Sequence, residues 1–328
     1  MQVIENMKNI AIVAGGDSSE YEVSLRSAEG LFGFIDRGRY NTYIVMLRKG
    51  QWTVRMPDGS TPDIDKNDFS FNVSGQKVKF DYAYITIHGR PGEDGRLQGY
   101  FDMLGIPYSS CGVLAGALTF NKFINNQFLK SQGIRVSDSI CLREGETAGT
   151  EEIISRLGLP VFVKPNDGGS SFGITKVKEA SQMQPAIEQA FAEGREVIIE
   201  RFVEGVEITC GCYKTKTKQV VFPITEVVTD NEFFDYNAKY NGEVQEITPA
   251  RISAELTKAV QQETLRVYNI IGARGIIRID YIIPKDSNPV LIEVNTNPGM
   301  TATSFIPQQI RAAGLSIGDV MTEIIENT

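Results

Sequence analysis

The stretch GIIRIDYIIPKDSNPVLIEVNTNPGMTATS, residues 275–304, contains the strongest structural pattern in the chain. Two runs rich in β-branched residues, 276–283 and 290–295, flank a six-residue turn that has a proline at each end. Such runs on either side of a turn rich in proline, asparagine and aspartate predict an antiparallel hairpin. The pairing of its two strands then decides which side chains face each other.

The register follows from the turn. If Ile283 pairs with Val290, two carboxylates lie opposite each other, and an arginine lies opposite an asparagine. Because side chains alternate along a strand, all four share one face of the hairpin. The facing carboxylates are Asp280 and Glu293, and the second pair is Arg278 and Asn295.

This face predicts a metal site. Two carboxylates directly opposite each other destabilise a sheet, and a hard cation between them removes the repulsion. Mg²⁺ takes oxygen ligands and shares one or two carboxylates with substrate phosphates. A solvated hairpin face is the alternative, but the guanidinium and amide on the same face favour a site. The turn at 297–301 follows directly, and its backbone N–H groups are suited to an anion.

The composition is that of an ordinary globular protein, with 328 residues, 41% hydrophobic and 23% charged. This length predicts two or three domains. With a net charge of −8 and no run of Lys or Arg, we expect no nucleic-acid and no membrane partner. There is no signal peptide pattern and no apolar run of about 20 residues. The cysteines have neither zinc-finger nor disulfide spacing, so we expect a cytoplasmic, reduced protein. They are Cys111, Cys141, Cys210 and Cys212.

The N-terminal segment predicts a doubly wound α/β domain. An apolar strand at 9–14, a Gly-Gly turn and a helix from about 19 to 35 begin such a unit, although the Rossmann pattern G-x-G-x-x-G is missing. Ser19 and Glu22 have the spacing of a capping box. Glu20 lies in the first helical turn, where a carboxylate is favoured by the helix dipole alone. A small β excursion is expected at 49–80.

Two loops are candidates for ligand contacts. His88, the one histidine, follows a predicted strand at 82–87 and begins a glycine-rich loop, where open α/β sheets bind ligands. It either lines a site or is structural. The segment 163–173, VKPNDGGSSFG, predicts a hairpin loop whose backbone N–H groups could close over a polyphosphate, with Lys164 beside it. It is not a Walker A motif, and a solvated hairpin tip is the alternative.

A helix is predicted at 121–132, with Lys122 outside its apolar stripe, and a short strand at 106–111. Further along, Glu200 and Glu207 form a second pair of acids. The segment 229–247 is polar, aromatic and without a regular period, which is typical of a lid in an enzyme.

Taken together, these motifs resemble the ATP-grasp superfamily and, within it, the D-alanine–D-alanine ligases. The resemblance covers nearly the whole chain. The motifs that carry it are GGDSSEYEVS at 15–24, IHGRPGEDG at 87–95, VKPNDGGSSFG at 163–173, FDYNAKY at 234–240, RID at 278–280 and EVNTNPGMT at 293–301.

The resemblance implies an α/β ATP-grasp fold of three α/β domains. These are an N-terminal domain at 1–118, a central domain at 119–203 that carries the glycine-serine loop, and a C-terminal domain at 204–328 that carries the lid and the hairpin. ATP would lie between the last two.

The resemblance also implies a role for each site residue. Lys122, Lys164 and Lys239 would contact nucleotide phosphates, and Glu200 and Glu207 the adenosine. Asp280, Glu293 and Asn295 would bind Mg²⁺, as two ions for which Mn²⁺ can substitute. Arg278 and the Gly299 N–H would stabilise an oxyanion, and Glu20 and Ser304 would contact D-alanine. Ser170 and Tyr240 would tie the loops to Glu20, and Tyr240 implies a D-alanine acceptor in preference to D-lactate.

The implied reaction joins two D-alanines through a D-alanyl phosphate, for peptidoglycan precursor synthesis by a homodimer. Phosphoryl transfer needs cations and positioning and no nucleophilic side chain, which fits these residue types. Two alternatives stay open. A related carboxylate–amine or carboxylate–hydroxyl ligase would share the ATP site and differ in its acceptor. A catalytically inactive ATP-grasp binding protein is the other, although the intact metal ligands disfavour it.

Overall fold

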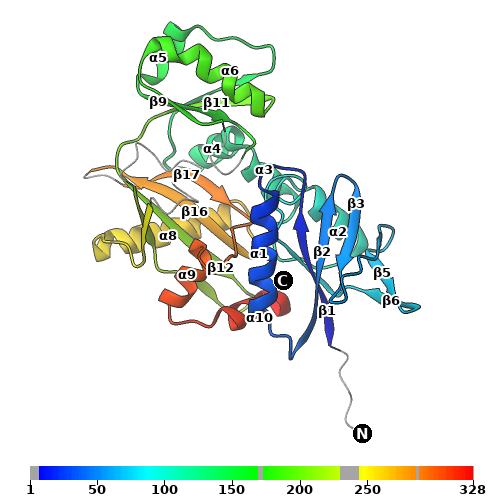
Figure 1. Ribbon diagram of the computed structural model, residues 1–328. Helices are drawn as coiled ribbons and strands as arrows, with labels where there is room; N and C mark the ends of the chain where they lie inside the picture. Colours follow the sequence, from blue (N-terminus) through cyan, green and yellow to red (C-terminus); the bar gives the residue numbers. More distant parts are fainter. Residues whose placement is uncertain (1–6, 169–172, 230–243, 286–287, 328) are drawn as a thin grey trace.

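The computed structural model describes residues 7–168, 173–229, 244–285 and 288–327. Within these residues, helices and strands are interspersed along the chain, and the strands form four sheets (Figure 1). The α/β class expected from the sequence is therefore confirmed. The predictions that concern Ser170, Lys239 and Tyr240 lie outside the described residues.

The N-terminal sheet has the order β3-β2-β1-β7, with β1 parallel to both β2 and β7. Its central strand β1 has a largely apolar sequence, because strands of parallel sheets are covered on both faces. Helix α1 packs on it, but its N-cap is Glu20 without a side-chain hydrogen bond, so the capping box predicted at Ser19 is wrong. The elements are β1 (Lys8–Gly15), α1 (Tyr21–Phe34), β2 (Tyr40–Arg48), β3 (Gln51–Arg55), β7 (Tyr82–Ile85), α2 (Arg96–Leu104) and α3 (Val113–Phe120).

The predicted excursion at 49–80 is confirmed as strand β3 and a small antiparallel sheet in the order β4-β5-β6. Edge-to-face aromatic contacts bind it to the main sheet, with Phe69 in contact with Trp52 and Phe101. The strand predicted at 106–111 is present only as a bridge from Tyr108 to Ala83. The small sheet consists of β4 (Ile64–Asp65), β5 (Ser70–Val73) and β6 (Gln76–Lys79).

The central sheet is antiparallel, in the order β10-β9-β11-β8, and lies at one end of the molecule in Figure 1. Helices α5 and α6 cover one of its faces, and α4 lies between it and the rest of the chain. The elements are α4 (Lys122–Ser131), β8 (Ser139–Arg143), α5 (Thr150–Leu157), β9 (Val161–Pro165), β10 (Thr175–Val177), a 3₁₀ turn (Ala180–Gln182), α6 (Met183–Glu193) and β11 (Glu196–Arg201).

The C-terminal sheet has the order β15-β14-β12-β16-β17, and β13 pairs with β12. Helix α9 packs directly on the backbone of β12. Gly211 makes this contact possible, because a Cβ at that position would lie only 2.4 Å from the Ile306 side chain. The elements are β12 (Val206–Lys214), β13 (Gln219–Val221), β14 (Thr225–Thr229), β15 (Val244–Ile247), α8 (Ala254–Ile270), β16 (Ile276–Ile283), β17 (Val290–Asn295), α9 (Phe305–Ala312) and α10 (Ile317–Asn327).

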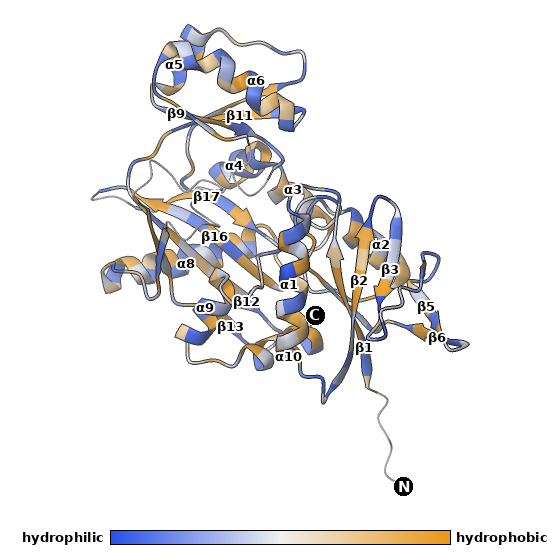
Figure 2. Ribbon diagram, viewed as in Figure 1, coloured by the Kyte–Doolittle hydropathy of each residue, from blue (hydrophilic) through white to orange (hydrophobic). Residues whose placement is uncertain are grey.

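One hydrophobic core joins the two ends of the sequence. Ile10 and Ile12 of β1 belong to the same buried cluster as Met321 and Ile324 of α10. In Figure 2, β1 and β2 are largely orange, whereas α1 alternates between blue and orange, as expected for a helix with one buried face. Gly30 allows α1 to lie close to the turn after β17, since a Cβ on Gly30 would be only 2.2 Å from the Met300 carbonyl oxygen. The turn after β17 is thus held against helix α1.

The hairpin of β16 and β17 has the predicted strand boundaries. Asp280 pairs with Glu293 as predicted. The predicted pairing of Ile283 with Val290 is wrong, because Val290 pairs with Ile282. A bulge that leaves Ile292 without a partner in the ladder shifts the register between the turn and the two carboxylates.

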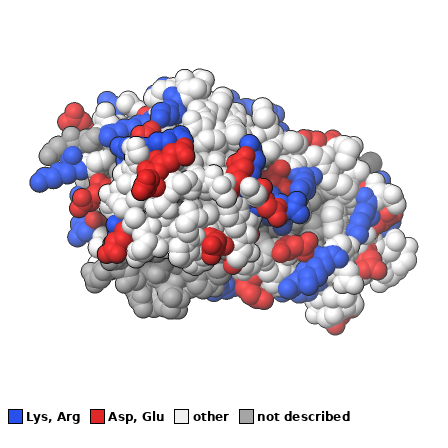
Figure 3. All heavy atoms as spheres, turned by 90° about the horizontal axis from the view of Figure 1, so that it is seen from above, with Lys and Arg blue, Asp and Glu red and all other residues white. Residues whose placement is uncertain are grey.

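The face shown in Figure 3 carries basic and acidic side chains interspersed, with large areas that carry neither. Within the described part of the chain, no helix has the length and apolar character needed to cross a membrane.

Candidate active site

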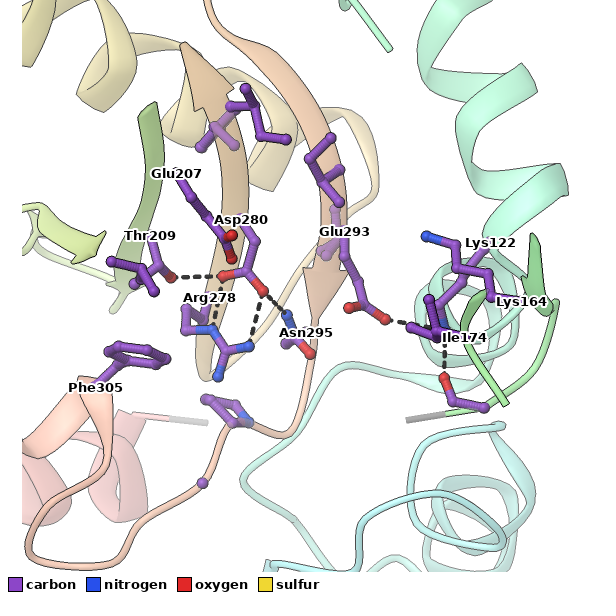
Figure 4. Close-up of a pocket in the computed structure, with 18 of the residues that line it drawn as sticks. Lys122, Lys164, Ile174, Glu207, Thr209, Arg278, Asp280, Glu293, Asn295 and Phe305 are labelled. Atoms are coloured by element: carbon purple, nitrogen blue, oxygen red, sulfur yellow. Dashed lines mark hydrogen bonds and ion pairs between the residues drawn. The ribbon is translucent and has the colours of Figure 1, made fainter. Parts of the chain in front are cut away.

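A pocket of about 790 Å³ lies between the hairpin, the start of α4 and the strand β9 (Figure 4). All predicted site residues that the structure describes line it, although they come from widely separated parts of the sequence. They are Glu20, Lys122, Lys164, Glu200, Glu207, Arg278, Asp280, Glu293, Asn295, Gly299 and Ser304. Their roles stay predictions, whereas their convergence on one cavity is observed.

The Asp280 carboxylate is the centre of a hydrogen-bonded cluster on the hairpin face (Figure 4). Arg278 donates to both of its oxygens, from Nε to Oδ1 at 2.9 Å and from Nη2 to Oδ2 at 2.8 Å. Asn295 Nδ2 donates to Oδ2 at 3.0 Å, and the Thr209 hydroxyl donates to Oδ1 at 2.6 Å. Burial lowers the pKa of Arg278, but Asp280 and then Glu293 outweigh it, so the net shift is upward.

Lys122 lies across the pocket from this face, as the first residue of α4. The side chain of Asn121 caps the helix by accepting a hydrogen bond from the Ile124 N–H at 2.9 Å. Lys122 Nζ lies 3.0 Å from a Glu293 carboxylate oxygen and also donates to the Gly168 carbonyl oxygen. Burial lowers its pKa, and the Glu293 carboxylate more than compensates, so the ammonium stays charged.

Lys164 and Glu200 form a buried ion pair at 2.5 Å on the central sheet. They lie on the neighbouring strands β9 and β11, and each side chain is less than a tenth exposed. Asn126 Nδ2 donates to the other carboxylate oxygen of Glu200 at 3.0 Å. A buried pair needs such additional hydrogen bonds to offset the cost of desolvation.

The N-terminal wall of the pocket consists of Glu20, His88 and Glu93. Burial lowers the pKa of His88, and the carboxylate of Glu20 opposes the shift only in part, so the imidazole is neutral at pH 7. Burial and then the negative charge of Glu20 raise the pKa of Glu93 to about 8. Of the two functions left open for His88, the structure supports the lining of the pocket.

The turn after β17 closes the floor of the pocket. Asn297 Nδ2 donates to the Ile87 carbonyl oxygen at 2.8 Å, which ties the turn to the loop that carries His88. Ser304 is the N-cap of α9, and its Oγ accepts a hydrogen bond from the Thr301 N–H at 3.1 Å. The turn therefore places backbone N–H groups and a hydroxyl at the edge of the cavity.

Lys122, Lys164 and Arg278 thus face several carboxylates in one cavity. The described residues include no group of three or more His, Cys, Asp or Glu side chains that would hold a metal without help from a substrate. Among these residues, Ser18 donates to the backbone carbonyl oxygen of His88, and the Nε2 atom of the imidazole has no hydrogen bond to a serine or cysteine. The arrangement suits the binding and transfer of an anionic group better than covalent catalysis by a side chain.

Comparison with known proteins agrees with this chemistry. Two family models, the D-ala D-ala ligase N-terminus and the D-ala D-ala ligase C-terminus, match residues 9–111 and 128–326. A D-alanine--D-alanine ligase of Parabacteroides distasonis is 66% identical over 320 residues, which cover 98% of this chain and 97% of that protein. The chain belongs to the D-alanine–D-alanine ligase family.

Solved structures of D-alanine ligases give the fold. The VanG D-Ala:D-Ser ligase of Enterococcus faecalis superposes with a TM-score of 0.86 at 32% identity, over 98% of this chain and 99% of that chain. A D-alanine--D-alanine ligase of Bacillus anthracis, complexed with ATP, superposes with a TM-score of 0.77 at 29% identity, over 98% and 97%. The ATP-grasp architecture expected for this chain is therefore confirmed.

Among the pocket residues that were not predicted from the sequence are Glu93, Thr209 and Phe305. Glu93 lies within the glycine-rich loop that begins at His88. Thr209 is two residues from Glu207 on β12, so strand alternation alone would have placed both on one face. Phe305 gives no signal in the sequence, because its ring lies 5.3 Å from the Arg278 guanidinium only in the folded chain.

Proposed function

We propose that this chain joins two D-alanine molecules into a dipeptide at the expense of ATP, through a D-alanyl phosphate. The observation that carries the proposal is the opposition of the Arg278–Asp280–Asn295 face to Lys122 and Lys164 across one cavity (Figure 4). Family membership supports the same reaction, since relatives that are 66% and 64% identical to this chain bear the name D-alanine--D-alanine ligase.

The metal ligands proposed are Asp280, Glu293 and Asn295. Their donor set fits Mg²⁺, which takes oxygen ligands. Two carboxylates are paired across the hairpin, and Asn295 adds a side-chain amide whose Nδ2 donates to Asp280. Two carboxylates and an amide leave room for phosphate oxygens to complete the coordination. When bound, Mg²⁺ (or Mn²⁺) would neutralise the developing charge on the transferred phosphoryl group.

In the first step, the carboxylate of one D-alanine attacks the γ-phosphate of ATP, and ADP leaves. Lys122 and Lys164 are buried ammonium groups that would hold phosphate oxygens, with Lys239 as a third. Glu200 and Glu207 would bind the adenosine. Glu20 would contact D-alanine, and Ser170 and Tyr240 would form a hydrogen-bonded chain with it beside the acceptor.

In the second step, the amine of the second D-alanine attacks the carbonyl carbon of the acyl phosphate, and phosphate leaves. The tetrahedral intermediate carries an oxyanion, which Arg278 and the Gly299 N–H would stabilise. Ser304, at the N-terminus of α9, would contact the acceptor carboxylate, where the helix dipole also favours an anion.

The organisation of the protein is also a proposal. The domain division at 1–118, 119–203 and 204–328 agrees with the sheets but cuts through the core shared by β1 and α10. We further propose a homodimer that works in the cytoplasm, where its product would enter peptidoglycan precursor synthesis.

The function is tested by measuring phosphate release from ATP and Mg²⁺ in the presence of D-alanine, D-serine or neither, with mass spectrometry of the products. We expect phosphate and D-alanyl-D-alanine in equal amounts, and little phosphate without an amino acid. Phosphate release without a dipeptide, or a product that contains D-serine in preference to D-alanine, would overturn the proposal.

A further inference from the structure

Thr209 makes a contact that the reaction described above does not use. It lies on β12 directly opposite Asp280 in the ladder with β16, and its hydroxyl donates to Asp280 Oδ1 at 2.6 Å (Figure 4). A hydrogen bond from a hydroxyl to a carboxylate is shorter and stronger than one between neutral groups. Each oxygen of Asp280 thus accepts from two side chains.

The hydroxyl needs this partner. Thr209 is only 2% exposed, and a buried hydroxyl without a good acceptor destabilises a fold. Valine has the same shape, is equally suited to a strand and has no hydroxyl to satisfy. The hydroxyl also lies at the limiting distance of 3.5 Å from the Ile279 carbonyl oxygen. The hydroxyl is therefore explained by Asp280 and not by packing.

Thr209 is itself held on a rigid platform. Its backbone is paired with β16 on one side and with Thr225 of β14 on the other. Its carbonyl oxygen accepts from Gln309 Nε2 at 3.0 Å, and Gln309 Oε1 accepts from the Gly211 N–H at 3.0 Å. Gln309 is fully buried, so α9 fixes β12 at this point. A β-branched side chain on such a strand has few rotamers to choose from.

The other donors to Asp280 have tasks of their own. Under the proposed function, Arg278 serves the oxyanion of the second step and Asn295 serves the metal ion. The hydrogen bonds of Arg278 to Asp280 would be weakened when its guanidinium engages the oxyanion. Thr209 has no such second task, so its hydrogen bond to the carboxylate persists throughout the reaction.

We propose that Thr209 is a positioning residue, whose hydroxyl fixes the Asp280 carboxylate in the orientation that binds a divalent cation. The inference rests on the proposed function, in which Asp280 is a metal ligand. Hydrogen bonds from the protein to a ligating side chain typically contribute 10–100-fold to metal affinity. We expect a change of this size when the Thr209 hydroxyl is removed.

The test compares Thr209→Val, which removes the hydroxyl, with Thr209→Ser, which retains it. Thr225→Val is the matched control. Thr225 is also buried and lies on the neighbouring strand, but its hydroxyl is hydrogen-bonded to Thr248, at 2.6 Å, and to Gln309. The measurements are Mn²⁺ affinity in the presence of ADP, from the electron paramagnetic resonance signal of free Mn²⁺, and the Mg²⁺ concentration for half-maximal turnover. Thermal unfolding verifies that each variant is folded.

We expect roughly 10-fold or more loss of Mn²⁺ affinity for Thr209→Val, restoration to within about 3-fold by Thr209→Ser, and no change for Thr225→Val. Thr209→Ala replaces Thr209→Val if the latter does not fold. Asp280→Asn tests the metal site separately from the positioning role of Thr209. If it leaves Mn²⁺ affinity unchanged, the metal site itself is misplaced. If Asp280→Asn weakens binding and neither Thr209→Val nor Thr209→Ala does, the function stands and the positioning role is wrong.

Discussion

Glu293→Gln removes one of the two carboxylates proposed for the metal and leaves the shape of the side chain unchanged. We expect turnover to fall by a factor of roughly 10² or more, which corresponds to about 2.7 kcal/mol of lost transition-state stabilisation. The loss should fall on kcat, because the cation acts on charge that develops during phosphoryl transfer. The Mg²⁺ concentration for half-maximal turnover should rise as well.

The fold should survive this change, because two effects of opposite sign nearly cancel. The substitution relieves the repulsion between Glu293 and Asp280 across the hairpin, which is worth up to about 1 kcal/mol. It also removes the ion pair between Glu293 and Lys122, whose charged atoms are 3.0 Å apart. The Glu293 side chain is 31% exposed. Lys122 is buried, but it keeps its hydrogen bond to the Gly168 carbonyl oxygen and the favourable charge of Glu200, so the loss of its partly exposed partner costs up to about 1 kcal/mol. We therefore expect a change of less than about 1 kcal/mol in the free energy of unfolding.

Glu323→Gln is the matched control. Glu323 is also 31% exposed and pairs with a lysine, Lys218, at 2.5 Å, but it lies on α10 and lines no part of the pocket. Steady-state kinetics with varied Mg²⁺ and urea unfolding are measured for both variants. Unchanged turnover of Glu293→Gln at saturating Mg²⁺, or an equal loss in Glu323→Gln, would refute the assignment of the metal face.

Three further predictions concern the walls of the pocket. Lys164→Met should weaken ATP binding and destabilise the fold by about 3 kcal/mol, since it leaves Glu200 as an unpaired buried carboxylate. Adding Glu200→Gln should recover stability, seen by urea unfolding, but not ATP affinity. Glu93→Gln should be more stable than the parent by an amount that grows between pH 4.5 and about 8, with an upper bound of roughly 5 kcal/mol. Tyr240→Phe, predicted from the sequence alone, should discriminate less between D-alanine and D-lactate as acceptors, with ATP affinity little changed.

The sign of the Glu93 prediction follows from the raised pKa in the folded state. The protonated carboxyl contributes its full stability below pH 4.5, and the contribution is lost as the pH rises through about 8. A difference between variant and parent that is constant from pH 5 to 9 would contradict it. For Lys164, a double variant no more stable than Lys164→Met would show that Glu200 does not depend on its partner. For Tyr240, equal use of D-lactate and D-alanine by the parent protein would remove the assigned role.

The sequence predicted the elements whose pattern is local. The strands at 276–283 and 290–295 have the boundaries expected from β-branched residues around a proline-flanked turn. The bulge at Ile292 was missed, because it lies in the run Val290–Ile292, where every side chain is apolar and a shift by one residue leaves the pattern unchanged. Asp280 and Glu293 face each other as predicted because two differences cancel: the pairing next to the turn is shifted by one residue, and the bulge at Ile292 restores the predicted register before the carboxylates.

Long-range contacts explain what the sequence did not predict. The helix α3 has apolar residues on all sides at 113–120, so no stripe distinguishes it from a link. The contact of α10 with β1 joins residues more than 300 positions apart, for which no local pattern gives a signal. The same holds for Gln309, whose side-chain amide donates to the Thr209 carbonyl oxygen and accepts from the Gly211 N–H. Ser170, Lys239 and Tyr240 stay predictions, because they lie outside the described residues.

The most direct test of the account follows the oxygen atoms of D-alanine. If a D-alanine carboxylate attacks the γ-phosphate and phosphate later leaves from the same carbonyl carbon, one carboxylate oxygen must move to phosphate. With D-alanine labelled by ¹⁸O in its carboxyl group, we predict that each phosphate released by this chain with ATP and Mg²⁺ carries one ¹⁸O, by mass spectrometry. Dipeptide formed together with unlabelled phosphate would contradict a D-alanyl phosphate and the reaction assigned to this pocket.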